Sequence, residues 1–337
     1  MYIVTGAAGH LGSHIVKELL SQGKSVRALY LPEEKCPEFI CENLHLLSKY
    51  YGDVRHSNSV ERMFYGCQEK MFIVIHCAAL ISITNKENRK VYDVNVNGTN
   101  TVIEACKKFP VFRFVYVSST HAIPLVPHGN VMREAQSFNP DNVTGYYDKT
   151  KAIAGQLVLD AASDGLNAVV VHPSGIIGPN GLPTGNMTKL IALYLCGKLP
   201  IAVKGGYDFV DVRDVATGVI EAADKGKNGE CYILSNRFVK LKEMFDILFH
   251  AGAKRKQRIQ LPFWVAKAIA PFAEIYYHFS NKTPLFTRYS LNTLLKNGIY
   301  SHEKASRDLN YKTRSITETL TDTAAWIKQN PQFYCKN

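Results

Sequence analysis

The stretch TGAAGHLG (Thr5–Gly12) lies where the first apolar run of the chain, YIVTG, ends and an amphipathic stretch, 11–21, begins. Its glycines, Gly6, Gly9 and Gly12, are spaced three residues apart. Glycine at a strand–helix junction permits a tight turn, a close approach of the backbone to a ligand, and close packing of helix on strand. The free N–H groups and positive dipole end of the following helix favour bound phosphate. The stretch therefore predicts a phosphate-binding loop at the start of an α/β sheet.

The remainder of the first half alternates short apolar runs with amphipathic stretches. We expect strands at 2–6, 25–31, 44–51, 71–78, 112–119 and 166–173, and helices at 11–21, 91–109 and 145–163. Strands that are apolar on both faces and alternate with helices indicate a parallel sheet covered on both sides. Right-handed crossovers make such a sheet doubly wound. The predicted fold class is therefore α/β, with a Rossmann-type doubly wound parallel sheet.

The pattern becomes irregular after Pro173. Residues 178–186 are rich in loop formers, 209–224 return to a strand and a helix, 230–235 resemble a late strand, and the remainder is mostly helical. We expect a Rossmann-type dinucleotide-binding domain formed by 1–177 and 209–235. A smaller, mostly helical substrate-binding lobe is expected from 178–208 and 236–337.

Composition narrows the class of protein. The chain has 337 residues, 46% of them hydrophobic and 20% charged, which is typical of a globular enzyme. The formal net charge of +11 favours anionic ligands such as nucleotides, or alternatively indicates only a basic solvated surface. The basic run KRKQR (254–258) has no interleaved aromatic residues and predicts a solvated loop, so we expect no nucleic-acid partner.

Three further features concern the setting of the protein. The eight cysteines are scattered without a Cys-x-x-Cys pair, which predicts no metal site and a reduced, cytoplasmic location. The chain begins with a strand, so we expect no signal peptide. The apolar segment 262–279 carries charges and Pro271 and is short for a membrane span. It predicts a buried or lid helix, with a membrane-surface helix as the alternative.

The stretch GYYDKTKA (Gly145–Ala152) holds a Tyr-x-x-x-Lys pair, but the pattern alone carries little weight. With 18 Tyr and 40 Lys+Arg in 337 residues, about two chance matches to Tyr-x-x-x-Lys/Arg are expected. The three Tyr-x-x-x-Lys matches are Tyr147/Lys151, Tyr194/Lys198 and Tyr300/Lys304. Gly197 interrupts the helix of the second, and the third is expected at a helix start far from the sheet edge. Tyr147 alone is expected at the sheet edge with the phosphate-binding loop and a strand end rich in hydroxyl groups, SST (118–120), earlier in the chain.

On a helix, Tyr147 and Lys151 lie on the same face, one turn apart. A Lys ammonium beside a phenol favours the phenolate, so we expect the pKa of Tyr147 to fall from about 10 toward neutrality. A phenol with such a pKa can donate a proton to a carbonyl, and a positioned serine can hydrogen-bond the same oxygen. The pair therefore predicts proton transfer to or from a carbonyl or alcohol oxygen.

Taken in order, TGAAGHLG, GDV, IHCAA, NVNGT, VSST, YDKTK, HPSGIIGP and FVDVRDVA resemble the successive motifs of the extended short-chain dehydrogenase/reductases, and they cover essentially the whole chain. The resemblance implies a Rossmann fold, a nicotinamide cofactor and a homodimer formed through sheet-flanking helices. It implies Tyr147 as general acid/base and Lys151 on the nicotinamide ribose. Ser119 would orient the substrate oxygen, with Ser118 as the alternative. Asn95 matches an asparagine that organises the sheet edge and a proton-relay water; alternatively it is a helix amide bonded to backbone.

The cofactor choice between NAD and NADP stays open. The second strand ends in Tyr30 and Leu31, neither acid nor base, and Lys35 follows on a nearby loop. Asp53, after the third strand, is expected to accept from the adenine amino group, or alternatively to cap a helix that begins near Ser57. The expected cofactor contacts are Gly6, Ala8, Gly9, His10, Leu11, Gly12, Tyr30, Asp53, Val54, Ala78, Ala79, Tyr147, Lys151, Pro173 and Ile176.

Two branches of the family compete. Nucleotide-sugar epimerases and dehydratases usually place Gly after the catalytic Tyr and an Arg ahead of the FVHV-like strand. Here Asp148 follows Tyr147, Tyr207-Asp208 precedes that strand, and HPSGII (172–177) replaces an Asn-bearing run. A diphosphate without its Arg would lose a charge-assisted bidentate contact.

The other branch, the 3β-hydroxysteroid dehydrogenases and dihydroflavonol reductases, acts on bulky apolar alcohols and ketones. YDKTKA resembles that branch, and the aromatic-rich segment 262–286 could wall an apolar pocket or simply pack in the core. We therefore expect an NAD(P)-dependent oxidoreductase that interconverts a secondary alcohol and a ketone on a steroid- or flavonoid-like small molecule. The alternatives are a nucleotide-sugar epimerase/dehydratase and a non-catalytic NAD(P)-sensing regulator.

Overall fold

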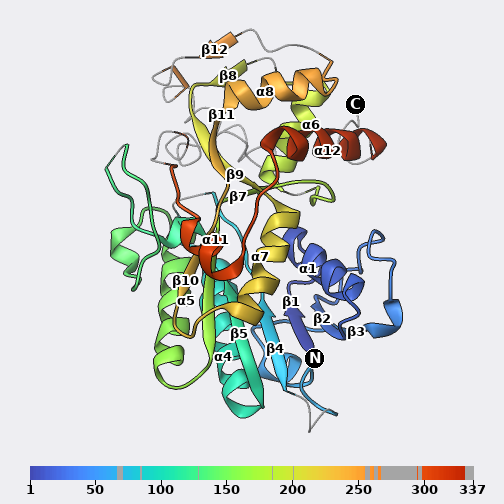
Figure 1. Cartoon of the computed structure of the whole chain (residues 1–337), viewed down its shortest axis with the longest axis vertical. Helices are drawn as coiled ribbons and strands as arrows, with labels where there is room; N and C mark the ends of the chain where they lie inside the picture. Colours follow the sequence, from blue (N-terminus) through green and yellow to red (C-terminus); the bar gives the residue numbers. More distant parts are fainter. Residues whose placement is uncertain are drawn as a thin grey trace.

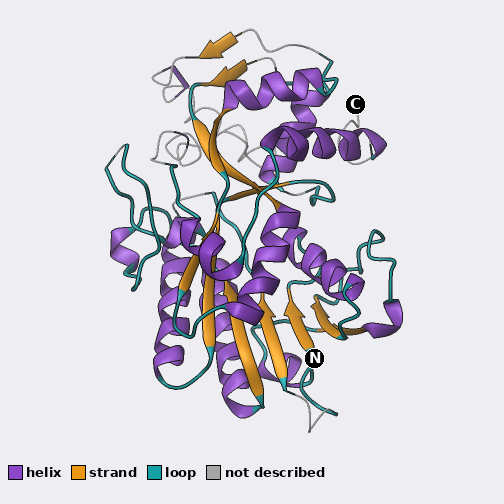
Figure 2. Ribbon diagram, viewed as in Figure 1, coloured by secondary structure: helices purple, strands orange, loops and turns teal. Residues whose placement is uncertain are grey.

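The computed structural model describes residues 1–66, 71–83, 86–127, 129–183, 185–199, 201–254, 259–261, 265–266, 294 and 298–330. Its centre is a seven-stranded parallel sheet with helices on both faces. A second lobe lies beyond the carboxyl ends of the strands (Figure 1, Figure 2). The predicted fold class is confirmed.

The central sheet has the strand order β10-β6-β5-β4-β1-β2-β3. Its strands are β1 (Tyr2–Thr5), β2 (Val26–Tyr30), β3 (Leu47–Tyr51), β4 (Phe72–His76), β5 (Val111–Val117), β6 (Ala168–Pro173) and β10 (Cys231–Leu234). The order runs in opposite directions on the two sides of the β1–β4 pair. In doubly wound sheets, ligands bind in the crevice at the carboxyl ends of the strands at such a reversal. The glycine-rich loop follows β1 and therefore lies at this crevice.

Two helical layers cover the sheet. One layer contains α1 (His10–Ser21), α7 (Val212–Lys225) and α11 (Glu303–Leu309), and the other contains α2 (Ser57–Glu61), α4 (Gly98–Lys108) and α5 (Tyr146–Ser163). Successive strand residues point to opposite faces, so Val4 packs in the core under α1 and Ile3 in the core under α4. This two-sided burial explains why the strands are continuous apolar runs.

The second lobe has its own core. It contains α6 (Asn186–Leu195), α8 (Leu241–His250), α12 (Ile316–Gln329), a sheet of β7 (Gly175–Ile177), β9 (Gly206–Asp211) and β11 (Arg237–Lys240), and a pair of β8 (Ile201–Val203) and β12 (Ile259–Leu261). These two small sheets accompany the helices that the sequence predicts. Within the predicted lobe segment, α11 packs instead against α7 and β10, with Ala305 and Leu309 buried in the core under α1. The exact division into domains stays a prediction.

The helix expected at 91–109 is interrupted. It comprises α3 (Arg89–Tyr92), a π-helical turn η2 (Asp93–Asn97) and α4. Single π turns within helices often occur at functional sites, and this one contains Asn95. Short 3₁₀ turns are η1 (Leu44–Leu46), η3 (Thr120–Ala122) and η4 (Pro140–Asn142).

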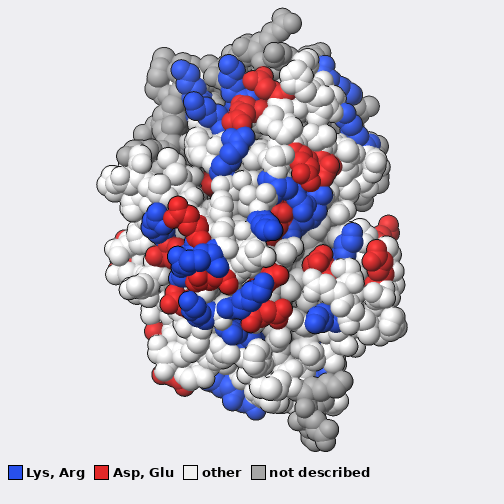
Figure 3. All heavy atoms as spheres, viewed as in Figure 1, with Lys and Arg blue, Asp and Glu red and all other residues white. Residues whose placement is uncertain are grey.

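The surface charge is mixed on the face that Figure 3 shows. Lys and Arg side chains lie among Asp and Glu side chains there. Elsewhere in the described part of the chain, Arg213 pairs with Asp211 at 2.7 Å and with Asp322 at 2.8 Å. Most of the run 254–258 lies outside the described residues.

The cysteines are not all free thiols. Cys36, Cys41, Cys77, Cys106 and Cys231 are free, whereas Cys196 is disulfide-bonded, which the spacing of the cysteines did not predict. Among the described residues, no helix is both long enough and apolar enough to span a bilayer. Nearly all of the segment 262–286 lies outside the described residues. The cellular location stays a prediction.

Candidate active site

The glycine-rich loop is shaped by close backbone contacts. Gly6 has φ +66°, and a Cβ there would lie 2.7 Å from the Ala78 backbone nitrogen. A Cβ on Gly12 would overlap the Gly6 carbonyl oxygen. The residue before α1 is Gly9, which has no side chain to cap the helix, so the first N–H groups of α1 are available to a ligand. The loop is therefore built to hold an anion at the helix N-terminus.

A cavity of about 480 Å³ runs from this loop to the second lobe. Its polar end holds Ser119, Tyr147 and Lys151. Apolar residues from both domains line the rest, including Ile81, Ile83, Leu182, Met187, Leu190, Leu199, Phe209, Leu241, Phe245 and Leu294. This size and lining suit a small ligand with a large apolar body.

Tyr147 and Ser119 meet at the carboxyl end of the sheet. Tyr147 lies in the first turn of α5, whose N-terminal residue follows Gly145 with φ +117°. Ser119 lies between β5 and η3, and its side chain hydrogen-bonds the Tyr147 side chain. This contact favours Ser119 over Ser118 as the partner of Tyr147. Burial, and then the neighbouring Asp148 carboxylate, raise the pKa of Tyr147 well above its usual value, against the lowering that we expected from Lys151.

Lys151 lies on the same helix but directs its ammonium to the sheet. Its Nζ donates to the Val117 carbonyl at 2.8 Å and to the Tyr116 hydroxyl at 3.3 Å. Burial lowers the pKa of Lys151 to about 7. The helical spacing predicts a shared face correctly, but a buried ammonium takes the nearest carbonyl oxygen as its partner, which the spacing cannot show.

Asn95 connects two parts of the site. Its Oδ1 accepts from the Leu80 backbone N–H at 2.8 Å, and its Nδ2 donates to the Leu80 carbonyl at 3.0 Å and to Thr150 Oγ1 at 3.0 Å. The amide thus fixes the loop after β4 against α5, next to Lys151. This geometry agrees with an organising role at the sheet edge; the relay of protons through water stays a prediction.

Two residues predicted to contact the adenosine part of the cofactor, Asp53 and Tyr30, do not line the main cavity. Asp53 accepts from the Arg55 backbone N–H at 2.9 Å and pairs with the Arg55 guanidinium at 2.7 Å, which lowers the pKa of Asp53. It does not cap α2, whose N-cap residue is His56. Tyr30 is fully buried beside Tyr51, so its side chain belongs to the core.

The predicted residues divide into two groups. The main cavity is lined by Gly6, Gly9, His10, Leu11, Gly12, Ala79, Ser119, Tyr147, Lys151, Pro173 and Ile176. The others, Ala8, Tyr30, Asp53, Val54, Ala78 and Asn95, lie outside this lining. Of these, Val54 is buried in the core and Ala78 packs against Gly6. The structure therefore brings most of the glycine-rich loop and the side chains of Ser119, Tyr147 and Lys151 to one cavity, and their roles stay predictions.

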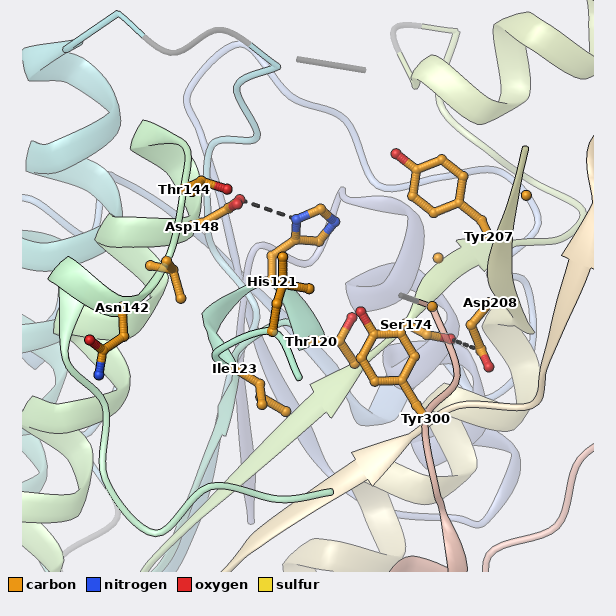
Figure 4. Close-up of a pocket in the computed structure, with 15 residues that line it drawn as sticks. Thr120, His121, Ile123, Asn142, Thr144, Asp148, Ser174, Tyr207, Asp208 and Tyr300 are labelled. Carbon is orange, nitrogen blue, oxygen red and sulfur yellow. Dashed lines mark hydrogen bonds and ion pairs between the residues drawn. The ribbon is translucent and has the colours of Figure 1, made fainter. Parts of the chain in front are cut away.

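The structure adds polar residues that the motifs did not predict as site residues (Figure 4). His121 Nδ1 lies 3.1 Å from the buried Asp148 Oδ1, and Ser174 donates to Asp208 Oδ1 at 2.6 Å. Tyr300, expected far from the sheet edge, hydrogen-bonds Thr120 in the same pocket, so that expectation was wrong. Each of Thr120, Asp148 and Ser174 directly follows a motif residue, which is the one signal that could have indicated them.

The other two Tyr-x-x-x-Lys pairs have structural partners. Tyr194 is buried in the core of the second lobe and stacks on Phe245, with ring centroids 4.4 Å apart. Lys304 pairs with Glu230 at 2.5 Å. Of the three pairs, Tyr147 and Lys151 are the one whose two described residues both line the main cavity.

The residues fit a dinucleotide. Gly6 and Gly12 lie so close to neighbouring backbone that a side chain at either position would displace the loop, the N-terminus of α1 is open, and the buried Lys151 lines the same cavity. A pyrophosphate at the loop and a nicotinamide ribose near Lys151 would use all three features. Among the described residues, no group of three or more His, Cys, Asp or Glu is arranged to hold a metal ion.

Known proteins similar to this chain include both dehydrogenases and epimerases. It is 28% identical over 331 residues to sterol demethylase protein B of Methylococcus capsulatus, covering 97% of this chain and 98% of the relative. It is 27% identical to the decarboxylating sterol-4-alpha-carboxylate 3-dehydrogenase of Schizosaccharomyces pombe, covering 95% of each chain. It is 26% identical to the UDP-glucose 4-epimerase of Pasteurella multocida, covering 98% of each.

The similarity extends to solved structures and to a family model. The crystal structure of gox2253 matches with a TM-score of 0.82 and 26% identity, covering 98% of each chain. Residues 2–235, more than half of the chain, match the model of one family. The protein therefore belongs to the NAD dependent epimerase/dehydratase family, as an NAD(P)-dependent enzyme of the extended short-chain dehydrogenase/reductase type.

Proposed function

We propose that the protein interconverts a secondary alcohol and a ketone on a bulky apolar substrate, with NAD or NADP as the redox cofactor. The observation that carries this proposal is the lining of the main cavity. Ser119, Tyr147 and Lys151 form one polar end, and the wall toward the second lobe is largely apolar. A substrate with one polar reacting group and a large apolar body matches this distribution. The sterol-related names of two similar proteins support the same substrate class.

In this mechanism Tyr147 transfers the proton. In the reductive direction its phenol donates to the oxygen of the ketone as negative charge develops there, and in the oxidative direction its phenolate accepts the alcohol proton. Ser119, which hydrogen-bonds Tyr147, holds the same substrate oxygen. The bound nicotinamide supplies or accepts the hydride. Lys151 would hold the nicotinamide ribose from its position beside the Val117 carbonyl.

The electrostatics around Tyr147 keep its hydroxyl group protonated. Burial and Asp148 raise the pKa of Tyr147, so its phenol is protonated at neutral pH. That is the form required to donate a proton to a ketone. Oxidation would require a further positive charge near the phenol to stabilise the phenolate.

A nucleotide-sugar epimerase is the second candidate, and the epimerase relatives support it. A bound nucleotide sugar carries a diphosphate that needs cations. Lys151 is the one Lys or Arg among the described residues that line the main cavity. Tyr207 and the buried Asp208 lie at the start of β9, where the nucleotide-sugar branch would have an arginine. A carboxylate at this position repels a diphosphate. A non-catalytic NAD(P) sensor is disfavoured because the Tyr147 and Lys151 pair is complete.

Cofactor absorbance tests these alternatives. Purified protein is assayed with NAD(H) and NADP(H) against apolar ketones and alcohols (steroids, flavonoids, aryl ketones) and, separately, against nucleotide sugars. We expect absorbance changes with the apolar panel that the Tyr147→Phe variant abolishes. Interconversion of a nucleotide sugar, detected by chromatography without a net absorbance change, would establish the epimerase function instead.

A further inference from the structure

A small side pocket lies beside the main cavity, next to the proposed catalytic groups. It has a volume of about 90 Å³ and shares His121, Ser174, Gly175 and Tyr207 with the main cavity. Its wall contains the residues that directly follow Ser119, Tyr147 and Pro173 in the chain. A substituent that enters this pocket is therefore attached close to the reacting carbon of the substrate.

Asp208 is the most unusual group in this pocket. It lies in β9, and only 2% of the residue is exposed. Its Oδ1 accepts from Ser174 Oγ at 2.6 Å and from the Asn236 backbone N–H at 3.2 Å. Its Oδ2 is buried without a hydrogen-bond partner in the described part of the chain. A buried acceptor without a donor destabilises the folded protein, so such atoms are rare and indicate a functional role.

The surrounding groups do not supply the missing donor. The hydroxyl proton of Ser174 is already donated to Oδ1. Tyr300 hydrogen-bonds Thr120, and the Arg237 guanidinium pairs with Glu243 at the surface. Burial raises the pKa of Asp208 to about 7, although its two hydrogen bonds and the charge of Arg237 act in the opposite direction. Above that pH the carboxyl group is ionised, and its free oxygen lacks a donor that a ligand could supply.

The charge of the pocket limits the class of that ligand. The wall opposite Ser174 and Asp208 holds a second buried acid, Asp148, paired with His121 (Figure 4). An anionic substituent such as a carboxylate or phosphate would face two carboxyl groups. A neutral hydroxyl can donate to one of them without such repulsion, and the small volume accommodates a group of this size.

We propose that this side pocket is a substrate subsite for a hydroxyl group attached beside the reacting carbon, with the free oxygen of Asp208 as its hydrogen-bond acceptor. Asp208 is then a specificity-determining residue, held in place by Ser174. This inference rests on the proposed alcohol–ketone chemistry, because that chemistry places the reacting carbon next to Ser119 and Tyr147.

Three ketones test the subsite: 1-tetralone, 2-hydroxy-1-tetralone and 2-methoxy-1-tetralone, which differ only beside the carbonyl. Their dissociation constants are measured by calorimetry at pH 8, above the pKa of Asp208, on cofactor-loaded protein that carries Tyr147→Phe, so that Asp208 is ionised and no turnover interferes. We expect the hydroxyl compound to bind about tenfold more tightly than 1-tetralone, the effect of one hydrogen bond to a buried carboxyl group. The methoxy compound, which cannot donate, should bind no better than 1-tetralone.

Asp208→Asn is the decisive second change. Two donors already face Oδ1, so the substituted amide keeps its carbonyl oxygen there and turns its NH₂ group into the pocket. The pocket then offers a donor instead of an acceptor, and the advantage of the hydroxyl over the methoxy compound should fall to about threefold or less. Asp160→Asn, at an exposed site on α5, is the matched control and should keep the original ratio. Melting curves establish that each variant is folded.

The outcomes separate this proposal from the proposed function. An unchanged hydroxyl preference in Asp208→Asn overturns the subsite, and so does an absence of preference, or of binding, before that change. Reduction of 1-tetralone by the unmodified enzyme is followed separately by cofactor absorbance. Turnover without a hydroxyl preference supports the proposed function and overturns the subsite. A hydroxyl preference that depends on Asp208, without turnover of any ketone, supports the subsite and overturns the redox assignment for this class.

Discussion

The cofactor crevice and the side pocket form their ligand-binding surfaces by different means. At the crevice, the backbone forms most of the ligand-binding surface. Glycines allow a ligand to approach the loop closely, and the N-terminus of α1 presents its N–H groups to it. At the side pocket, side chains from distant segments form the surface, among them Asp148, Ser174, Asp208 and Tyr300. A site formed by backbone is disrupted by substitution of its glycines, whereas a site formed by side chains can change its ligand through a single substitution.

The largest effect is expected where the two regions meet, at Tyr147. Tyr147→Phe removes the hydroxyl that transfers the proton and keeps the ring that packs beside His121. General acid catalysis typically contributes about 10²–10⁴-fold, so kcat should fall by that factor while the cofactor dissociation constant stays nearly unchanged. Cofactor absorbance and fluorescence titration measure the two quantities. Retained turnover would remove Tyr147 from the mechanism.

The crevice is probed next by Gly12→Ala. The added Cβ would overlap the Gly6 carbonyl oxygen, and backbone cannot move as cheaply as a side chain. A strain of about 1–3 kcal/mol at the loop corresponds to a cofactor dissociation constant raised by roughly 10–100-fold. Gly9→Ala is the graded comparison, because its Cβ would lie 3.1 Å from the same oxygen. Equal cofactor binding by both variants would contradict a backbone-made site.

The same contrast explains what the sequence could predict. The glycine spacing, the two-sided apolar strands and the position of Tyr147 after the loop depend on local pattern, and the structure places them as expected. The position of the Lys151 ammonium and the location of Tyr300 depend on tertiary contacts. Asp208 and Ser174 are 34 positions apart in the chain and meet only because β9 pairs with β7. A contact between such distant residues leaves no periodic pattern in the sequence.

The side pocket should reveal its buried acid through the pH dependence of stability. The pKa of Asp208 is raised to about 7 in the folded protein, above the ordinary value of 3.8. Between these two pH values the folded state binds the proton and the unfolded state does not, so stability falls as pH rises from about 4 to 7. Asp208→Asn removes this contribution, and its melting temperature relative to the unmodified protein should rise by about 2–8 °C across that interval.

The exposed Asp160→Asn variant serves as the control for this titration, since its carboxyl group lies at the surface of α5. Its melting temperature should follow that of the unmodified protein at each pH. A parallel course for Asp208→Asn would mean that Asp208 ionises normally and that the pocket is better solvated than its geometry indicates.

The smallest effect is expected at Glu34, a side chain that should influence which cofactor the crevice binds. Glu34 Oε2 accepts from the Leu31 backbone N–H at 2.9 Å, which places a carboxylate at the end of β2, where doubly wound proteins contact the adenosine ribose. A 2′-phosphate would meet this negative charge, so NAD⁺ should bind more tightly than NADP⁺. Glu34→Gln should narrow the ratio of the two dissociation constants by about 2–5-fold, the size expected for a partly exposed charge. Glu33→Gln, on an exposed neighbour, should leave the ratio unchanged. Tighter binding of NADP⁺ to the unmodified protein would show that the crevice takes its specificity from another residue, and that its side chains matter less than this contact indicates.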